Sequence, residues 1–246
     1  MNRSSPSVAH EEVARFSAQA GQWWQADGPF SALHKLGPVR LNYIEEQIAA
    51  LMNRKPPYKG LRILDVGCGG GLIAEDLAAQ GARVVGLDAS IETIEVAKAH
   101  AAEQGLAIDY RIGSVEELAR GKERFDVITA FEIVEHVADL KSFMAALTKL
   151  LKPQGIVIVA TLNRTTRSFL FGVVAAEYVL GWVPEGTHDW DSFVKPSELA
   201  SLWATGGVTP VDLTGLVYRP LLKSFEISKQ NVAVNYFMTG RKEITP

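Results

Sequence analysis

Cysteine is almost absent from the 246-residue sequence, in which Cys68 is the only one. A single cysteine excludes an internal disulfide and suits a reducing compartment. An excess of basic residues is missing as well, because 25 lysines and arginines stand against 28 aspartates and glutamates, for a net charge of -3. Nucleic-acid binding is therefore not expected, since phosphate contacts need a basic face.

Long hydrophobic runs are also absent. The longest apolar stretch, Phe169–Val183, is shorter than the roughly 20 residues that span a bilayer, and it carries Glu177. It therefore does not predict a transmembrane helix. The first residues, MNRSSPSVAHEEVARF, contain no apolar segment of the kind found in a secretory signal. We expect a cytoplasmic protein.

What the chain does contain is an alternation of short β-branched runs and longer helix-like segments, beginning at Leu61. Continuous apolar strands separated by helices are typical of a parallel sheet in a doubly wound, Rossmann-like α/β fold. A chain of this length with 47% hydrophobic residues suits one such domain. Five strands are predicted within LRILDVG, RVVGLD, IDYRIG, FDVITAF and GIVIVATLN, and two more near Val211–Tyr218 and Asn231–Arg241.

The first part of the chain lies outside this alternation. Residues 1–58 are predicted to form an N-terminal helical cap on the domain of residues 59–246, with a helix from Pro38 to about Asn53. The cap also carries Trp23 and Trp24, which could contact an aromatic substrate or anchor the cap in the core.

An apolar insertion, residues 163–195, follows the fifth predicted strand and begins with Arg164 and Arg167. It could sit on anionic lipid as an interfacial segment, or it could be a buried helix that covers the active site, and the two roles are compatible. His188 and Asp189 near its end could line a substrate cavity.

A glycine-rich turn, LDVGCGGG, follows the first predicted strand and opens a helix. Glycines let the backbone pass close to a ligand, and a helix N-terminus offers free N–H groups. Asp88 ends the next strand, where a carboxylate can accept hydrogen bonds from both hydroxyls of a ribose. Together these features predict a site for an adenosine-containing cofactor.

The spacing of Gly69, Gly71 and Ala74 also fits the GxGxxA pattern of dinucleotide-binding proteins, so the glycines alone leave NAD open. Asp65, just before the glycines, would repel a pyrophosphate but could hold a positively charged, methionine-like ammonium group. The chain has only one glycine loop and leaves little length for a separate substrate domain. S-adenosylmethionine is therefore the better fit.

Three candidate functional residues, Glu132, Glu135 and His136, follow the fourth predicted strand in the segment FEIVEHV. If the chain turns helically here, all three project to one side. Two carboxylates and an imidazole can ligate a divalent cation and leave positions open for two neighbouring oxygens of a catechol. Alternatively, His136 could be a metal-free general base with an ordinary pKa near 6.5, or the segment could only order the loop.

Several of these motifs carry a family resemblance. LDVGCGGG, GLD, FDVITAFEIVEHV and LKPQG resemble the class I S-adenosylmethionine-dependent methyltransferases. The segments ARFSAQAGQWWQADGPFSALHKLGPVRLNYI, ATLNRT, AEYVLGWVPEGTHDW and VAVNYFMTGRK more narrowly resemble the bacterial ubiquinone biosynthesis O-methyltransferases and their mitochondrial relatives, from about Glu11 to Lys242. The resemblance implies a seven-stranded sheet with its last strand antiparallel, and methylation of phenolic hydroxyls of polyprenylated ubiquinone precursors at both O-methylation steps.

The resemblance also implies which residues contact the cofactor. Arg40 would hold the methionine carboxylate, Asp88 the ribose hydroxyls, and Ser114 would lie near the adenine. Phe131 stands where relatives often carry methionine. The full set implied is Arg40, Gly67, Gly69, Asp88, Ser114 and Phe131.

For the chemical step, the resemblance implies a Mg²⁺ ion or similar cation held by Glu132, Glu135 and His136, with Glu135 and His136 as the catalytic pair. It further implies a prenylated substrate, peripheral contact with anionic lipids of the cytoplasmic membrane, and other ubiquinone-pathway enzymes as possible partners. Two alternatives are a methyltransferase for another small phenol or carboxylate, and a cofactor-binding regulator without turnover.

Overall fold

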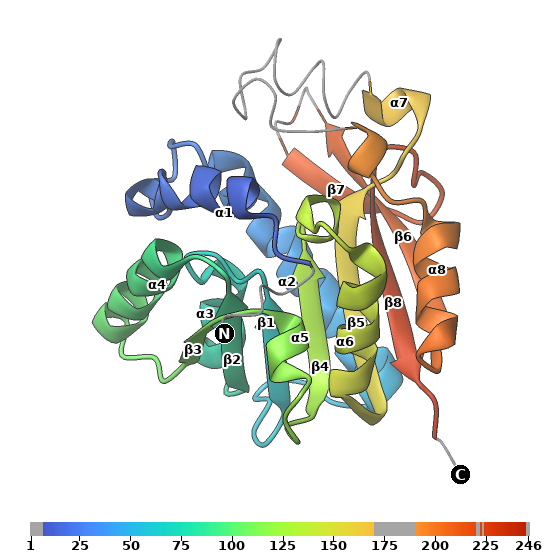
Figure 1. Cartoon of the computed structure of the whole chain (residues 1–246), viewed down its shortest axis with the longest axis horizontal. Coiled ribbons are helices and arrows are strands. Elements are labelled where there is room, and N and C mark those ends of the chain that lie inside the picture. Colours follow the sequence, from blue (N-terminus) through green and yellow to red (C-terminus); the bar gives the residue numbers. More distant parts are fainter. Residues whose placement is uncertain (1–6, 170–189, 220–221, 223, 245–246) are drawn as a thin grey trace.

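The computed structural model describes residues 7–169, 190–219, 222 and 224–244. Within this part of the chain, eight strands form one sheet in the order β3-β2-β1-β4-β5-β8-β6-β7. The strands are β1 (Arg62–Val66), β2 (Arg83–Asp88), β3 (Asp109–Ile112), β4 (Phe125–Phe131), β5 (Leu151–Leu162), β6 (Val208–Arg219), β7 (Ser224–Ser228) and β8 (Asn235–Lys242). The first five run parallel, and β8 joins the edge of β5 antiparallel (Figure 1). The Rossmann-like α/β prediction is confirmed.

The strand count differs from the expected seven. The short strand β7 pairs antiparallel with β6, so that Tyr218 lies opposite Phe225 in a hairpin. The segment SFEIS alternates polar and apolar residues over only five positions and stays half-buried, which gives it little hydrophobic signal in the sequence. It extends the edge of the sheet beyond β6.

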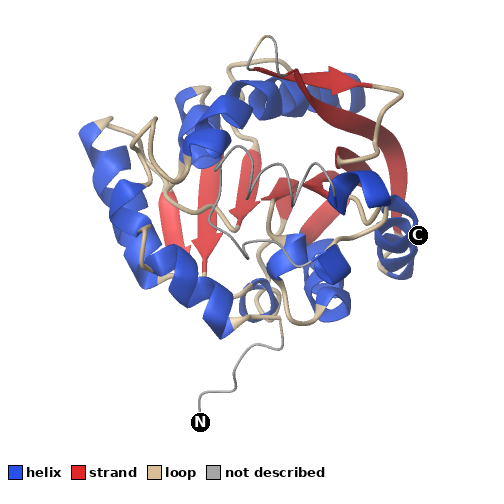
Figure 2. Ribbon diagram, turned by 90° about the horizontal axis from the view of Figure 1, so that it is seen from above, coloured by secondary structure: helices blue, strands red, loops and turns tan. Residues whose placement is uncertain are grey.

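Helices cover both faces of this sheet (Figure 2). They are α2 (Ser31–Met52), α3 (Leu72–Ala79), α4 (Ile91–Glu103), α5 (Val115–Leu118), α6 (Leu140–Leu150) and α8 (Pro196–Thr205). The N-terminal helix is α1 (His10–Ser17). Four elements of three residues each complete the set: η1 (Ala20–Gln22), η2 (Val134–His136), α7 (Thr166–Ser168) and η4 (Trp190–Ser192). Neighbouring residues of a strand point to opposite faces. On β1, accordingly, Ile63 packs with α2, α3 and α4, and Leu64 packs with α5, α6 and α8.

The cap helix α2 is longer than the sequence predicted. It begins at Ser31 rather than at Pro38, so the proline lies inside the helix, and it ends as expected before the left-handed Asn53. Its buried face repeats at helical spacing, with Arg40, Tyr43, Ile44, Gln47 and Ile48 among the buried positions. The helix therefore carries a buried cation into an otherwise apolar layer.

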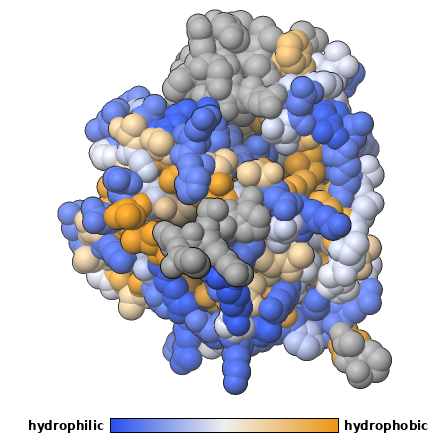
Figure 3. All heavy atoms as spheres, in the orientation of Figure 1, coloured by the Kyte–Doolittle hydropathy of each residue, from blue (hydrophilic) through white to orange (hydrophobic). Residues whose placement is uncertain are grey.

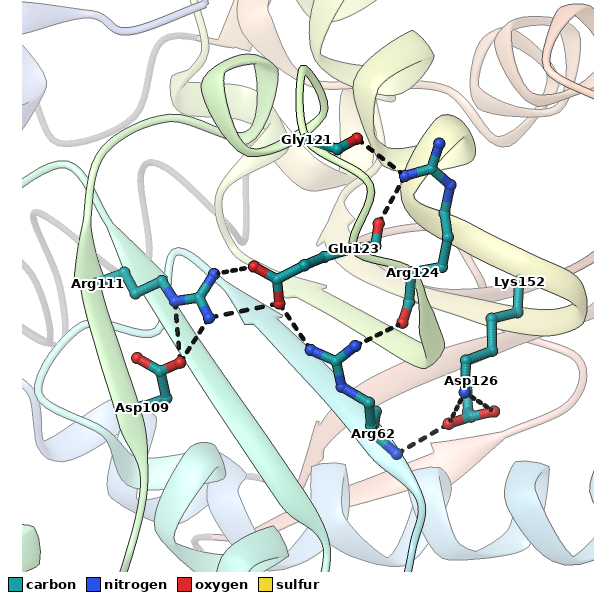
Figure 4. Close-up of polar contacts among 8 residues, drawn as sticks. All are labelled: Arg62, Asp109, Arg111, Gly121, Glu123, Arg124, Asp126 and Lys152. Carbon is teal, nitrogen blue, oxygen red and sulfur yellow. Dashed lines mark hydrogen bonds and ion pairs between the residues drawn. The ribbon is translucent and has the colours of Figure 1, made fainter.

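An ion-pair network ties the strands together at the end of the sheet where β1 and β4 begin (Figure 4). Glu123 accepts from Arg62 and from Arg111, both at 2.7 Å, and Asp126 accepts from Lys152 at 2.8 Å.

The face of the molecule seen in Figure 3 is largely hydrophilic, with apolar residues in smaller groups. Among the described residues, no helix is long and apolar enough to cross a bilayer. Most of the predicted apolar insertion, including His188 and Asp189, lies outside them.

Candidate active site

A cavity opens at the opposite end of the sheet, where β1, β2 and β4 finish. In the sheet, β2 and β3 lie on one side of β1, and β4 and β5 lie on its other side. Such a switch in strand order leaves a crevice at the carboxyl ends of the strands. Every residue predicted above as a cofactor contact, metal ligand or catalytic residue lines this cavity. They are Arg40, Gly67, Gly69, Asp88, Ser114, Phe131, Glu132, Glu135 and His136.

The glycine loop adopts a backbone that few other residues accept. Gly67, Gly69 and Gly71 have φ angles of 67°, 54° and 99°. The cap packs directly on this loop: a Cβ atom at Gly69 would lie 2.0 Å from the Trp23 ring, and Trp24 Nε1 donates to the Gly70 carbonyl at 3.1 Å. The two tryptophans anchor the cap, as one of the two interpretations of the sequence expected.

Asp88 ends β2 beside the loop. One carboxylate oxygen accepts from Gly69 N at 3.0 Å and the other from Ser90 N at 2.9 Å. Burial raises the pKa of this carboxyl, and the backbone hydrogen bonds oppose the increase. Each oxygen can accept a further bond, so a pair of vicinal hydroxyls is a suitable ligand.

Asp65 lies at the end of β1 with 4% of its surface exposed. Its carboxylate accepts from the Thr129 hydroxyl at 2.7 Å, and burial raises its pKa to about 7. The nearby charge of Arg40 opposes that increase, and the charge of Asp88 adds to it. A cationic ligand would stabilise the ionised form, as expected for the ammonium group of a methionine-like cofactor.

The buried guanidinium of Arg40 forms an ion pair with Glu132, which the sequence did not predict. Glu132 also accepts from Asn235 Nδ2 at 3.1 Å, and its φ of 45° is unusual for a residue other than glycine. Arg40 lies 5.6 Å from the centre of the Phe131 ring. The residue expected to hold the methionine carboxylate is thus at the cavity, where it pairs with an internal carboxylate.

Ser114 begins α5 and caps it. Its hydroxyl accepts from Glu117 N, and its own backbone N–H donates to the Glu117 carboxylate, both at 3.2 Å. This reciprocal pair fixes the loop between β3 and α5 at the rim of the cavity. Ser114 therefore forms part of the cavity wall, and its contact with an adenine stays a prediction.

The expected helical turn that projects Glu132, Glu135 and His136 to one side is wrong. Only Val134–His136 form a single 3₁₀ turn, and Glu132 precedes it with a left-handed backbone. Glu135 accepts from the Thr161 hydroxyl at 2.8 Å, whereas His136 Nδ1 lies 2.7 Å from Glu12. With each side chain held by a different partner, the described residues contain no group of three acidic, histidine or cysteine side chains arranged as metal ligands.

Glu135 is a buried carboxyl at the cavity. Burial raises its pKa to about 8, and the neighbouring charge of Glu132 adds to the increase. One of its carboxylate oxygens, Oε1, is buried without a hydrogen-bond partner. A proton on this group, or a cation beside it, would offset that cost.

Glu12 is a residue of the cavity that the sequence analysis missed. It belongs to α1, and the acidic run HEEVARF reads as an ordinary exposed helix start. Only the fold brings it to His136. Another residue missed is Asn235, at the start of β8, which reaches Glu132 across the sheet.

Comparisons with known proteins agree with this geometry. Residues 64–159 match the methyltransferase domain family. A ubiquinone biosynthesis O-methyltransferase from Cereibacter sphaeroides is 48% identical over 95% of this chain and 96% of its own length, and one from Bartonella bacilliformis is 47% identical over 98% and 99%. The fold resembles that of magnesium protoporphyrin IX methyltransferase from Synechocystis PCC 6803 with bound SAH, at a TM-score of 0.66 and 16% identity, covering 95% of this chain and 99% of the other. The chain is therefore an S-adenosylmethionine-dependent methyltransferase and belongs to the ubiquinone biosynthesis O-methyltransferase family.

Proposed function

We propose that the chain transfers the methyl group of S-adenosylmethionine to phenolic hydroxyls of polyprenylated ubiquinone precursors, and that it serves both O-methylation steps. The names of relatives that match nearly the whole chain support this substrate class. The observation that carries the proposal is the cavity itself, in which the glycine loop and Asp88 line the same space as His136.

For the cofactor, we propose that Asp88 holds the ribose hydroxyls and Asp65 the ammonium group. Arg40 would hold the methionine carboxylate. To do so, its guanidinium must either bind this carboxylate and Glu132 together or leave Glu132. The lining of the cavity by Gly67 and Ser114 supports contacts of the loop with the ribose and of Ser114 with the adenine.

Methyl transfer from a sulfonium is an in-line displacement, so alignment of the phenolic oxygen with the methyl group is the main task of the protein. A phenol with a pKa near 10 is a weak nucleophile at neutral pH until its proton is removed. We propose that His136 accepts this proton on Nε2 as the oxygen–methyl bond forms and the sulfur–methyl bond breaks. The products are the methyl ether, S-adenosylhomocysteine and an imidazolium that returns its proton to water.

A divalent cation is the second candidate for activating the phenol. As arranged, Glu132, Glu135 and His136 do not form a complete ligand set. One observation favours a cation nevertheless: the neighbouring carboxylates of Glu132 and Glu135 line the cavity, and Glu135 Oε1 has no hydrogen-bond partner. A bound cation would stabilise the phenolate oxygen by its charge.

We also propose peripheral contact with anionic lipid through the apolar insertion, which would let a prenyl tail stay in the bilayer. The support is the sequence of the insertion and its basic start. Arg167 is exposed, whereas Arg164 already pairs with Glu198. Flotation with anionic liposomes tests this contact, and a chain that stays with the soluble fraction would leave the insertion only a role as a lid.

The function is tested by transfer of a labelled methyl group to a short-tailed demethylubiquinol analogue, with a tailless catechol as competitor. Transfer to the prenylated analogue with little competition is the expected result. Absence of label in either acceptor would indicate a cofactor-binding regulator. The same assay after chelation, followed by titration with Mg²⁺, decides between the two activation schemes: full turnover without metal leaves the His136 scheme, and turnover restored only by Mg²⁺ favours the cation.

A further inference from the structure

The N-terminal helix α1 is fixed across the mouth of the cavity at two separated points. The carbonyl of Ser7 accepts from Ala138 N at 3.0 Å, just after the η2 turn, and the hydroxyl of Ser17 lies 2.7 Å from that of Ser90 at the start of α4. In Figure 1, α1 lies at the end of the sheet where β1 and β2 finish. Side chains of α1 therefore form one wall of the cavity, among them Glu12 and Phe16.

Glu12 contacts the imidazole of His136 from this wall. Its carboxylate oxygen Oε2 lies 2.7 Å from His136 Nδ1 and accepts from Arg15 Nη2 at 2.6 Å. Phe16, one turn further along α1, meets the same imidazole edge to face, with 5.6 Å between the ring centres. The His136 ring is thus held by a charged acceptor at Nδ1 and by a perpendicular contact with an aromatic ring.

This contact selects one of the two ring nitrogens. A carboxylate is only an acceptor, so Nδ1 must carry a hydrogen to bond with Glu12. In the neutral ring the lone pair is then on Nε2, at the far side of the imidazole. A third group that orients a base in this way is a recurrent arrangement in enzymes that activate hydroxyl groups.

We propose that Glu12 is a positioning residue, which holds His136 by Nδ1 so that Nε2 is presented to the phenolic oxygen of the substrate. The inference rests on the proposed function, in which His136 meets that oxygen. It assigns the cap a direct part in the reaction: α1 supplies the group that orients a side chain of the methyltransferase core. Arg15, by bonding the same oxygen, keeps the Glu12 carboxylate in place.

The alternative is that Glu12 only fastens α1 to the core. Three variants separate the two roles. Glu12→Ala removes the acceptor, Glu12→Gln keeps an acceptor oxygen at the same length, and Glu11→Ala is the matched control because it removes the neighbouring, exposed acid of the same helix. A purely mechanical anchor would affect folding and cofactor affinity, whereas a positioning residue affects the turnover of a chain that still binds its cofactor.

We expect Glu12→Ala to lower kcat about 10- to 100-fold, the size of loss known for removal of a group that orients a metal-binding histidine. Its affinity for S-adenosylhomocysteine and its melting temperature should stay close to those of the wild type. Glu12→Gln should recover part of kcat, and Glu11→Ala should match the wild type. Wild-type kcat in Glu12→Ala, or a loss explained by weaker cofactor binding alone, would overturn the proposal.

A readout without turnover distinguishes this inference from the proposed function. In ¹⁵N spectra of histidine-labelled protein, His136 should show a protonated Nδ1 and an unprotonated Nε2 above the pKa of the ring, and Glu12→Ala should lose that preference. An unchanged tautomer in Glu12→Ala contradicts the positioning role. If His136→Ala keeps full turnover while the tautomer still depends on Glu12, the role of His136 in the proposed function fails and the orientation by Glu12 stands.

Discussion

The guanidinium of Arg40 and the carboxylate of Glu132 form a buried ion pair between the cap and the end of β4. The side chains are 5% and 20% exposed, so water does little to screen the pair. Arg40 also lowers the pKa of both Asp65 and Glu135, although desolvation keeps each raised overall. A single cation of α2 therefore stabilises three acidic groups around one cavity.

Substitution of Arg40 should affect folding and cofactor binding together. Arg40→Ala leaves the Glu132 charge without its cation, and breaking a buried pair from one side typically costs about 3–5 kcal/mol. We expect a lower free energy of unfolding by chemical denaturation and weaker binding of S-adenosylmethionine by calorimetry. Glu132→Gln serves as the control. It breaks the same ion pair but keeps Arg40, the residue proposed to hold the methionine carboxylate of the cofactor. Equal cofactor affinity in Arg40→Ala and Glu132→Gln would contradict the role of Arg40 in binding.

Asp88→Asn should weaken binding of the cofactor without unfolding the glycine loop. The amide oxygen can still accept from one backbone N–H, but the charged acceptor for the ribose is lost. Since hydrogen bonds to a charged group contribute about 1.5–3 kcal/mol, the dissociation constant should rise roughly 10- to 100-fold. Calorimetry with S-adenosylhomocysteine measures the change, and Glu95→Gln, on the exposed side of α4, is the control. An unchanged constant in Asp88→Asn would remove Asp88 from the ribose site.

Gly69→Ala and Gly105→Ala are a matched pair of variants that tests how much the packing of Trp23 on the glycine loop contributes to stability. Both glycines have positive φ angles, of 54° and 67°, so both substitutions cost backbone strain of about 1–2 kcal/mol. At Gly105 a Cβ atom meets nothing within 4 Å, whereas at Gly69 it would meet the Trp23 ring. Denaturation should therefore show a larger loss of stability for Gly69→Ala, accompanied by weaker cofactor binding. Equal losses for both variants would show that Trp23 moves away at little cost.

Asp65 should give the chain a pH-dependent stability. Its pKa in the folded state is about 7, above the ordinary value of 3.8, so the folded chain keeps a proton that the unfolded chain releases. The stabilisation is complete below about pH 4 and is lost as the pH rises to about 7, by an amount on the order of 4 kcal/mol.

Denaturation of the wild type and of Asp65→Asn across this range tests the prediction. The amide does not titrate, so the free energy of unfolding of Asp65→Asn should fall less steeply between about pH 4 and 7. Parallel curves for the two proteins would contradict the raised pKa. Saturation with S-adenosylmethionine should reduce the slope of the wild type, because an ammonium beside Asp65 favours the ionised form.

The sequence predicted the parts of the fold and site that depend on local pattern. Strand ends, the glycine turn and Asp88 are signalled by residues near one another in the chain, and the fold delivers them to one cavity. The N-cap of α4 is of the same local kind, since the hydroxyl of Ser90, directly before the helix, accepts from Thr93 N.

What could not be predicted depends on contacts between distant segments. The pairing of Arg40 with Glu132 joins residues 92 positions apart, and Glu12 reaches a histidine from a helix whose sequence looks like an ordinary surface. The FEIVEHV segment was misjudged because its spacing fits a helical turn, whereas β4 runs into a left-handed residue and a 3₁₀ turn instead. Hydrophobic periodicity does not report such a change of backbone direction.

The contact of Trp23 with Gly70 gives one glycine of the loop a role in packing. Gly70, unlike Gly67, Gly69 and Gly71, has no positive φ angle, and a Cβ atom there would lie 2.3 Å from the indole ring. The packing of the tryptophan is therefore enough to require glycine at this position. In related sequences we therefore expect a glycine at this position wherever the tryptophan of the cap is present.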